Sequence, residues 1–261
     1  MLRNRLIFSL IYSDGAFTQS RNFRLQKVGD INWLERNYKF QKISFSLDEL
    51  IVLNATKTNK DIFEFSKVVS RLVNDVFIPV AAGGGIKSIS DADLLFRSGA
   101  DKVVVNSCIE SNPQTVKEIV SKYGSQSIVA CVDYKVIDGK PKIFVDDGSR
   151  AIDTDLDTYL TKIQKLEVGE IVLNSIDKDG TGFGFDIEVI NTYSELIDVP
   201  LIIMGGAGNG QHLKEGLDSA NVSAVATANL FNFIGNGLPK AREYMIGSGA
   251  NLAQWDLEKI I

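Results

Sequence analysis

The sequence predicts one α/β domain, a (β/α)8 barrel that covers residues 1–261 and consists of two similar halves, at about 1–125 and 126–261. Two observations predict this fold. Short, nearly continuous apolar stretches alternate with longer amphipathic ones, which is typical of parallel strands covered on both faces by helices. The chain also repeats itself at half length. A length of 261 residues is typical for one barrel of this kind.

Eight apolar stretches are the candidate strands, and the segments between them have helical periodicity, most clearly residues 61–72. No segment looks like a linker or has low complexity, which favours a closed barrel over an open doubly wound sheet. The predicted strands cover residues 6–11, 49–54, 78–82, 102–106, 128–133, 170–174, 200–204 and 224–228.

The internal repeat supports the closed barrel independently. Residues 78–85, which end in three glycines, correspond to residues 199–206, which end in two. The motif Ile-Val-Leu-Asn occurs at 51–54 and again at 171–174. Each half therefore supplies four strands, and the third strand of each half ends in glycine.

Composition excludes several classes of function. The net charge of −5 argues against a nucleic acid as the main partner. No apolar run reaches the ~18 residues of a membrane span, and the apolar stretch near the N-terminus is too short for a secretion signal. Cys108 and Cys131 have neither disulfide-framework nor metal-ligand spacing. We therefore expect a cytoplasmic protein that needs no metal or organic cofactor.

Glycines at strand ends predict two phosphate sites on opposite sides of the barrel mouth. Glycine lets the backbone approach a ligand, and the following helix offers free N–H groups to an anion. The alternative is that these glycines only form tight turns. Two clusters at equivalent positions of a repeat favour phosphate binding, with the predicted contacts Gly84, Gly85, Asn106, Ser107, Gly205, Gly206, Gly208, Ala228 and Asn229.

Asp133 is the candidate catalytic residue, because it ends the fifth predicted strand and would point into the mouth of the barrel. The alternative is a helix-capping or loop aspartate. The repeat pairs Asp133 with Ile11, so the opposite half lacks the matching carboxylate. Asp179 and Thr181 follow the sixth strand and are candidate ligand contacts, or else belong to an ordinary Asp-Gly turn.

Four charged residues are predicted at the bottom of the barrel, where the strands begin. Arg5, Glu49, Lys102 and Glu170 start the first, second, fourth and sixth strands. Two acids and two bases that converge there could form a salt-bridged ring. By spacing alone, the simpler interpretation is a plug that neutralises itself and serves stability.

The chain also resembles the cyclase subunit family of imidazole glycerol phosphate synthase over essentially its whole length. The resemblance implies a TIM-barrel lyase of histidine biosynthesis that binds a glutaminase at its bottom face and passes ammonia through the barrel to a doubly phosphorylated substrate. The resemblance also implies that the four charged residues form an ammonia gate and that Asp101 faces the glutaminase. The motifs that carry it are residues 1–5, 82–86, 99–103 with Asn106, 177–181 and 205–208.

Three positions depart from that family. Its first-strand acid or base falls on Ile11, a loop lysine on Gln19 and a second-strand aspartate on Asn54. Isoleucine cannot transfer a proton, and loss of a positioned acid or base typically costs roughly 10²–10⁴ in rate. A divergent branch of the family looks similar in this respect, and its members supply ammonia to sugar-amidating enzymes of surface-polysaccharide synthesis. We expect this chain to work in the same way.

Three other interpretations stay open. The chain could be the histidine-pathway cyclase, with Asp133 compensating for the losses. It could be a non-catalytic module that binds a phosphorylated ligand and activates a glutaminase. It could also be an isomerase built on the same repeat, although that enzyme needs a first-strand acid and no gate. The loop at residues 14–29 is long enough to be a lid.

Overall fold

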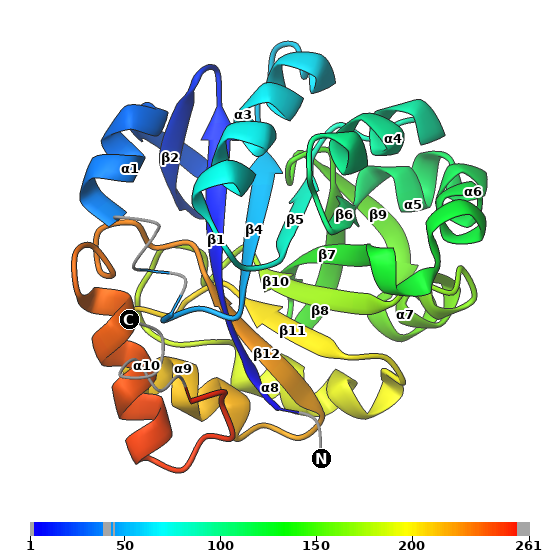
Figure 1. Ribbon diagram of the computed structural model, residues 1–261. Helices are drawn as coiled ribbons and strands as arrows, with labels where there is room; N and C mark the ends of the chain where they lie inside the picture. Colours follow the sequence, from blue (N-terminus) through cyan, green and yellow to red (C-terminus); the bar gives the residue numbers. More distant parts are fainter. Residues whose placement is uncertain (1–2, 39–42, 44, 255–261) are drawn as a thin grey trace.

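The computed structural model describes residues 3–38, 43 and 45–254, so Met1 and Leu2 of the N-terminal motif lie outside it. Its centre is a closed barrel of parallel strands with helices packed around the outside (Figure 1). Around the barrel the order is β10-β11-β12-β1-β4-β5-β6-β7, and β7 pairs with β10 to close the ring. The predicted (β/α)8 fold is confirmed.

The eight barrel strands agree with the predicted stretches to within a few residues. They are β1 (Arg5–Ser13), β4 (Glu49–Asn54), β5 (Val80–Gly83), β6 (Lys102–Val105), β7 (Ile128–Ile137), β10 (Glu170–Ser175), β11 (Leu201–Met204) and β12 (Val222–Thr227).

The third strand of each half begins later than predicted, after Pro79 and after Pro200. Both prolines accept a hydrogen bond through their carbonyl, from Leu50 N at 2.9 Å and Ile171 N at 3.1 Å. Proline has no N–H to donate to the sheet, so the regular pairing starts one residue further on.

Two antiparallel hairpins project above the barrel, one in each half, and the strand pattern did not predict them. They are β2 (Ala16–Arg21) with β3 (Arg24–Gly29), and β8 (Lys140–Val145) with β9 (Arg150–Asp155). Strands β1 and β7 continue past the barrel rim and turn back through Asp-Gly pairs into β2 and β8. The expected loop at 14–29 is thus a hairpin.

Helices cover the outside of the barrel. Residues 61–72, predicted to be helical, form most of α3. Asp61 caps the N-terminus of this helix, because its side chain accepts hydrogen bonds from the N–H groups of Phe63 and Glu64. The helices are α1 (Ile31–Tyr38), α3 (Ile62–Asp75), α4 (Ile89–Arg97), α5 (Ser107–Ser111), α6 (Pro113–Tyr123), α7 (Leu156–Gln164), α8 (Ile187–Tyr193), α9 (Gly210–Leu217) and α10 (Gly237–Gly247), with 3-10 turns η1 (Ser125–Ser127) and η2 (Ser194–Leu196).

Two apolar clusters stabilise this arrangement. The larger lies between the strands and the helices, and the smaller fills the barrel interior with side chains such as Ile7, Ile51, Val172 and Ile202. The interior is therefore a packed core. Within the described residues, no helix has both the length and the apolar character that crossing a membrane would require.

Candidate functional site

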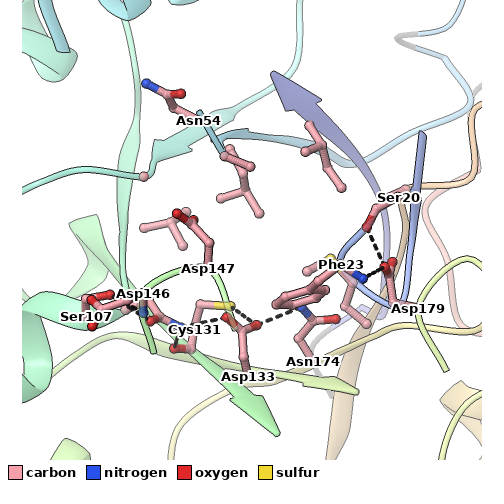
Figure 2. A pocket seen from close by; sticks show the side chains of 18 of the residues that line it. Ser20, Phe23, Asn54, Ser107, Cys131, Asp133, Asp146, Asp147, Asn174 and Asp179 are labelled. Atoms are coloured by element: carbon pink, nitrogen blue, oxygen red, sulfur yellow. Dashed lines mark hydrogen bonds between the residues drawn. The ribbon is translucent and has the colours of Figure 1, made fainter. Parts of the chain in front are cut away.

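A cavity of about 600 Å³ opens at the C-terminal ends of the barrel strands (Figure 2). Both halves of the chain line it, because closure of the barrel brings all eight strand ends to one face. Most of the predicted site residues meet there, namely Gly84, Gly85, Asn106, Ser107, Asp133, Asp179, Gly205, Gly206, Ala228 and Asn229.

Two predicted ligand contacts lie outside the cavity lining, and both form hydrogen bonds within local turns. The Thr181 hydroxyl donates to the carbonyl of Lys178 at 2.7 Å, and the Gly208 N–H donates to His212 Nδ1 at 3.3 Å. Neither Thr181 nor Gly208 is among the described residues that line the cavity.

Asp133 lies in the wall of the cavity, 8% exposed, and two carboxamides hold it in place. Asn174 Nδ2 donates to one carboxylate oxygen at 2.7 Å, and Asn106 Nδ2 donates to the other at 2.9 Å. Burial raises the pKa of Asp133 to about 6, although the hydrogen bonds from Asn174 and Cys131 oppose the shift. Above that pH the carboxylate can accept a proton from a ligand.

Among the described residues, β1 contributes only Ile11 to the cavity lining, so the strand opposite Asp133 presents no ionisable side chain there. Three strands separate β1 from β7 in either direction around the barrel, and Ile11 of β1 faces the cavity. Gln19 is uncharged, and its amide donates to the Ser20 carbonyl and accepts from Leu230 N at 2.8 Å. Asn54 Oδ1 accepts from Thr56 N at 3.1 Å.

Asp179 holds the first hairpin over the cavity. One of its carboxylate oxygens accepts from the Ser20 hydroxyl at 2.5 Å and from Phe23 N at 3.0 Å, as Figure 2 shows. Asn22, at the hairpin tip, donates through its side chain to the carbonyls of Ile176 and Asp177. Because Asp179 is engaged in these bonds, its carboxylate positions the hairpin.

The second hairpin reaches the same cavity from the other side. Asp146 N, in the turn between β8 and β9, donates to Ser107 Oγ at 2.9 Å. Asp147 follows it and pairs with Lys60 Nζ at 2.6 Å. Phe23 of the first hairpin leaves no room for a side chain at Gly148, since a Cβ there would lie 2.6 Å from its ring.

Sequence reasoning missed Asn174, Lys60 and Asp147 as cavity residues. The repeat contained a signal for Asn174, because it is the counterpart of Asn54 at the end of an equivalent strand. Lys60 and Asp147 are far apart in sequence, and only the hairpin brings them together.

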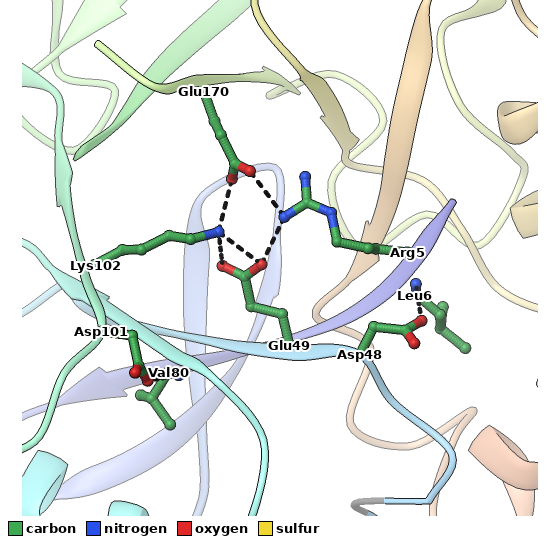
Figure 3. A network of polar contacts seen from close by, with 8 residues as sticks. All are labelled: Arg5, Leu6, Asp48, Glu49, Val80, Asp101, Lys102 and Glu170. Atoms are coloured by element: carbon green, nitrogen blue, oxygen red, sulfur yellow. Dashed lines mark hydrogen bonds and ion pairs between the residues drawn. The ribbon is translucent and has the colours of Figure 1, made fainter. Parts of the chain in front are cut away.

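The four charged residues at the bottom of the barrel form one closed ring of ion pairs (Figure 3). Arg5 pairs with Glu49 at 2.7 Å and with Glu170 at 2.9 Å. Lys102 pairs with the same two carboxylates at 3.0 and 3.1 Å. Burial raises the pKa of Glu49, which is 2% exposed, and the charges of Lys102 and Arg5 oppose that effect. Cations and anions therefore alternate around the axis.

Asp101 lies beside this ring on the exposed bottom edge and accepts a hydrogen bond from Val80 N at 2.8 Å. Between the ring and the cavity, the barrel interior is apolar. Val104, Cys131 and Met204 belong both to the interior cluster and to the cavity lining, and Leu53 of the lining packs against that cluster, so they form the cavity floor.

His212 is half-buried in the first turn of α9, and both cysteines are buried free thiols. In the described part of the chain, no group of three or more His, Cys, Asp or Glu side chains could hold a metal ion.

Comparisons with known proteins agree on one family. Residues 18–235 match the family described as "Histidine biosynthesis protein". The chain is 43% identical over 258 residues to a protein of Parasynechococcus marenigrum (strain WH8102) provisionally named imidazole glycerol phosphate synthase subunit hisF2, covering 98% of this chain and 96% of that protein. Imidazole glycerol phosphate synthase subunits HisF of Streptococcus mutans and Chlorobaculum tepidum are 36% and 34% identical, covering 89% and 94% of this chain and 92% and 96% of theirs.

Asn174→Leu should raise the pKa of Asp133 further, by on the order of one unit, because the amide hydrogen bond stabilises the carboxylate and leucine excludes water from the same space. A carbon-detected NMR titration of the Asp133 carboxyl measures this pKa. Asn54→Leu is the matched control, since Asn54 ends the equivalent strand and makes no bond to Asp133. An unchanged titration midpoint of Asp133 in Asn174→Leu would contradict the stabilisation of this carboxylate by Asn174.

Lys102→Met should lower the free energy of unfolding by ~2–4 kcal/mol, because it leaves the buried carboxylate of Glu49 and the partly buried one of Glu170 with Arg5 as their remaining cation. Urea unfolding gives the value. Lys122→Met removes an exposed lysine that pairs with Asp93 and should cost no more than ~1 kcal/mol. Equal losses in the two variants would show that the ring is no more stabilising than a surface ion pair.

Proposed function

Because this chain belongs to the histidine biosynthesis protein family, as a relative of imidazole glycerol phosphate synthase subunits, we propose that it is the barrel subunit of a glutamine amidotransferase. A glutaminase partner docks at the bottom face near Asp101 and releases ammonia there. The ammonia passes the ring of Arg5, Glu49, Lys102 and Glu170 and reaches a phosphorylated ligand in the upper cavity.

The charges and polarity along the barrel axis support this route. The ring closes the bottom with alternating charges, and an apolar interior follows. An apolar interior disfavours ammonium, since an unpaired ion is costly to desolvate, whereas neutral ammonia lacks that penalty. The cavity above holds Asp133, whose pKa of about 6 leaves it ionised at neutral pH, ready to accept a proton.

For the acceptor, we propose a sugar that is amidated during the synthesis of a surface polysaccharide, rather than the imidazole precursor. One observation carries this choice: Ile11 faces the cavity from the strand opposite Asp133, where ring closure by paired acid and base needs a second ionisable group. The neighbouring amides of Gln19 and Asn54 do not replace it, because they do not ionise near neutral pH.

The second candidate is the histidine-pathway cyclase. The relatives from S. mutans and C. tepidum favour it, since both carry the name of that synthase and match nearly the whole chain. The retained Asp133, held by two carboxamides, also suits proton transfer in that reaction.

A direct assay separates the two candidates. Purified chain is given the doubly phosphorylated ribulosyl substrate of the synthase with excess ammonium salt at alkaline pH, and formation of imidazole glycerol phosphate is followed. We expect a rate roughly 10²–10⁴ below that of the S. mutans subunit, because one acid or base is missing. Ile11→Asp should raise this rate at least ~10-fold.

Ile11→Leu serves as the control, because it repacks the same position without adding an ionisable group. A wild-type rate equal to that of the S. mutans subunit would reject sugar amidation as the leading proposal and put the histidine pathway first. A gain with Ile11→Leu equal to that with Ile11→Asp would show that packing, and not proton transfer, limits the reaction.

A further inference from the structure

We propose that Lys60 binds the phosphate of the ligand and that the carboxylate of Asp147 occupies Lys60 as an internal competitor while the cavity is empty. This inference rests on the proposed function only in that the ligand is phosphorylated. Both residues lie at the end of the cavity formed by the first half, where Lys60 binds the ligand and Asp147 competes for Lys60.

The basic side chains of the cavity lie at one end. Among the described residues, its lining includes three basic side chains, Lys57, Lys60 and Lys87, and all three come from the loops that follow β4 and β5. The described lining residues of the second half include glycines but no lysine or arginine. A phosphate is therefore attracted most strongly to the first-half end, next to Gly84 and Gly85.

Lys60 differs from the other two lysines in how firmly it is held. Lys57 and Lys87 are exposed on the rim, whereas the Lys60 side chain is 22% exposed. Its stem lies over Gly85, since a Cβ at that glycine would be 3.1 Å from Lys60 Cβ. The ammonium group is thus tethered above one of the predicted phosphate-binding glycines.

Asp147 reaches this ammonium from the turn between β8 and β9. Its carboxylate lies 2.6 Å from Lys60 Nζ, and Figure 2 shows it pointing into the cavity. The same turn also occupies Ser107, whose hydroxyl accepts from Asp146 N. Two of the groups best suited to hold a phosphate, an ammonium and a hydroxyl, are therefore engaged by the chain itself.

The turn that carries Asp147 has two consecutive non-glycine residues with positive φ. Asp146 and Asp147 have φ angles of 55° and 56°, in the left-handed region that non-glycine residues adopt infrequently. A phosphate ester with up to two negative charges attracts Lys60 more strongly than the single charge of Asp147 does. Binding then frees Asp147 to move away from the anion.

Isothermal titration calorimetry with ribose 5-phosphate tests this on four proteins: the wild type, Asp147→Asn, Lys60→Met and the double variant. Asp147→Asn should bind roughly 10-fold more tightly, because the competitor loses its charge but keeps its size. Lys60→Met should bind roughly 10-fold more weakly, the range expected for a lost hydrogen bond to a charged group. The double variant should match Lys60→Met, because Asp147 acts through Lys60.

The matched control is Asp153→Asn, which removes the same charge from an exposed position on β9 and should leave the affinity unchanged. Melting temperatures without ligand confirm that each variant is folded. Weaker binding by Asp147→Asn would overturn the inference, as would a gain that persists when Lys60 is methionine. Absence of binding in all four proteins would overturn the phosphorylated ligand of the proposed function as well.

Discussion

Closure of the parallel sheet is the constraint on which the rest of the structure depends. When β7 pairs with β10, the strand beginnings converge at one face and the strand ends at the other. The first convergence brings Arg5, Glu49, Lys102 and Glu170 within ion-pair distance. The second brings Asp133 to a cavity shared by both halves. In an open sheet, the same residues would lie along two separate edges.

The two halves share a similar order of elements but contribute different side chains to the cavity. Each contributes a third strand with glycines at or just after its end and a hairpin above its first strand. The second half holds Asp133, whose carboxylate is oriented by Asn174 of the same half and by Asn106 of the first half. The first half supplies the basic side chains and an apolar wall at Ile11. The candidate proton acceptor and the basic side chains of the cavity thus come from different halves of the repeat.

Local patterns in the sequence predicted the barrel strands, the charged ring and most cavity glycines, because strands and their ends depend on short-range periodicity. The hairpins escaped prediction although an Asp-Gly turn leads into each of them, Asp14-Gly15 between β1 and β2 and Asp138-Gly139 between β7 and β8. Such a turn is a recognised signal for antiparallel strands. Contacts such as Lys60–Asp147 could not be predicted, since they depend on how far a hairpin reaches in space. The Thr181 hydroxyl donates to the nearby carbonyl of Lys178, a local contact that composition does not indicate.

The pairing of β1 with β12 has a consequence for how the protein is made. Strand β1 leaves the ribosome first, yet one of its two barrel neighbours is the last strand of the chain. At ordinary rates of synthesis, that edge waits on the order of ten seconds or longer for its partner. During this interval Ile7 and Phe8 belong to an open, apolar sheet edge, the kind of surface that pairs with other chains. A newly made chain therefore keeps one apolar strand edge unpaired until the final strand has emerged.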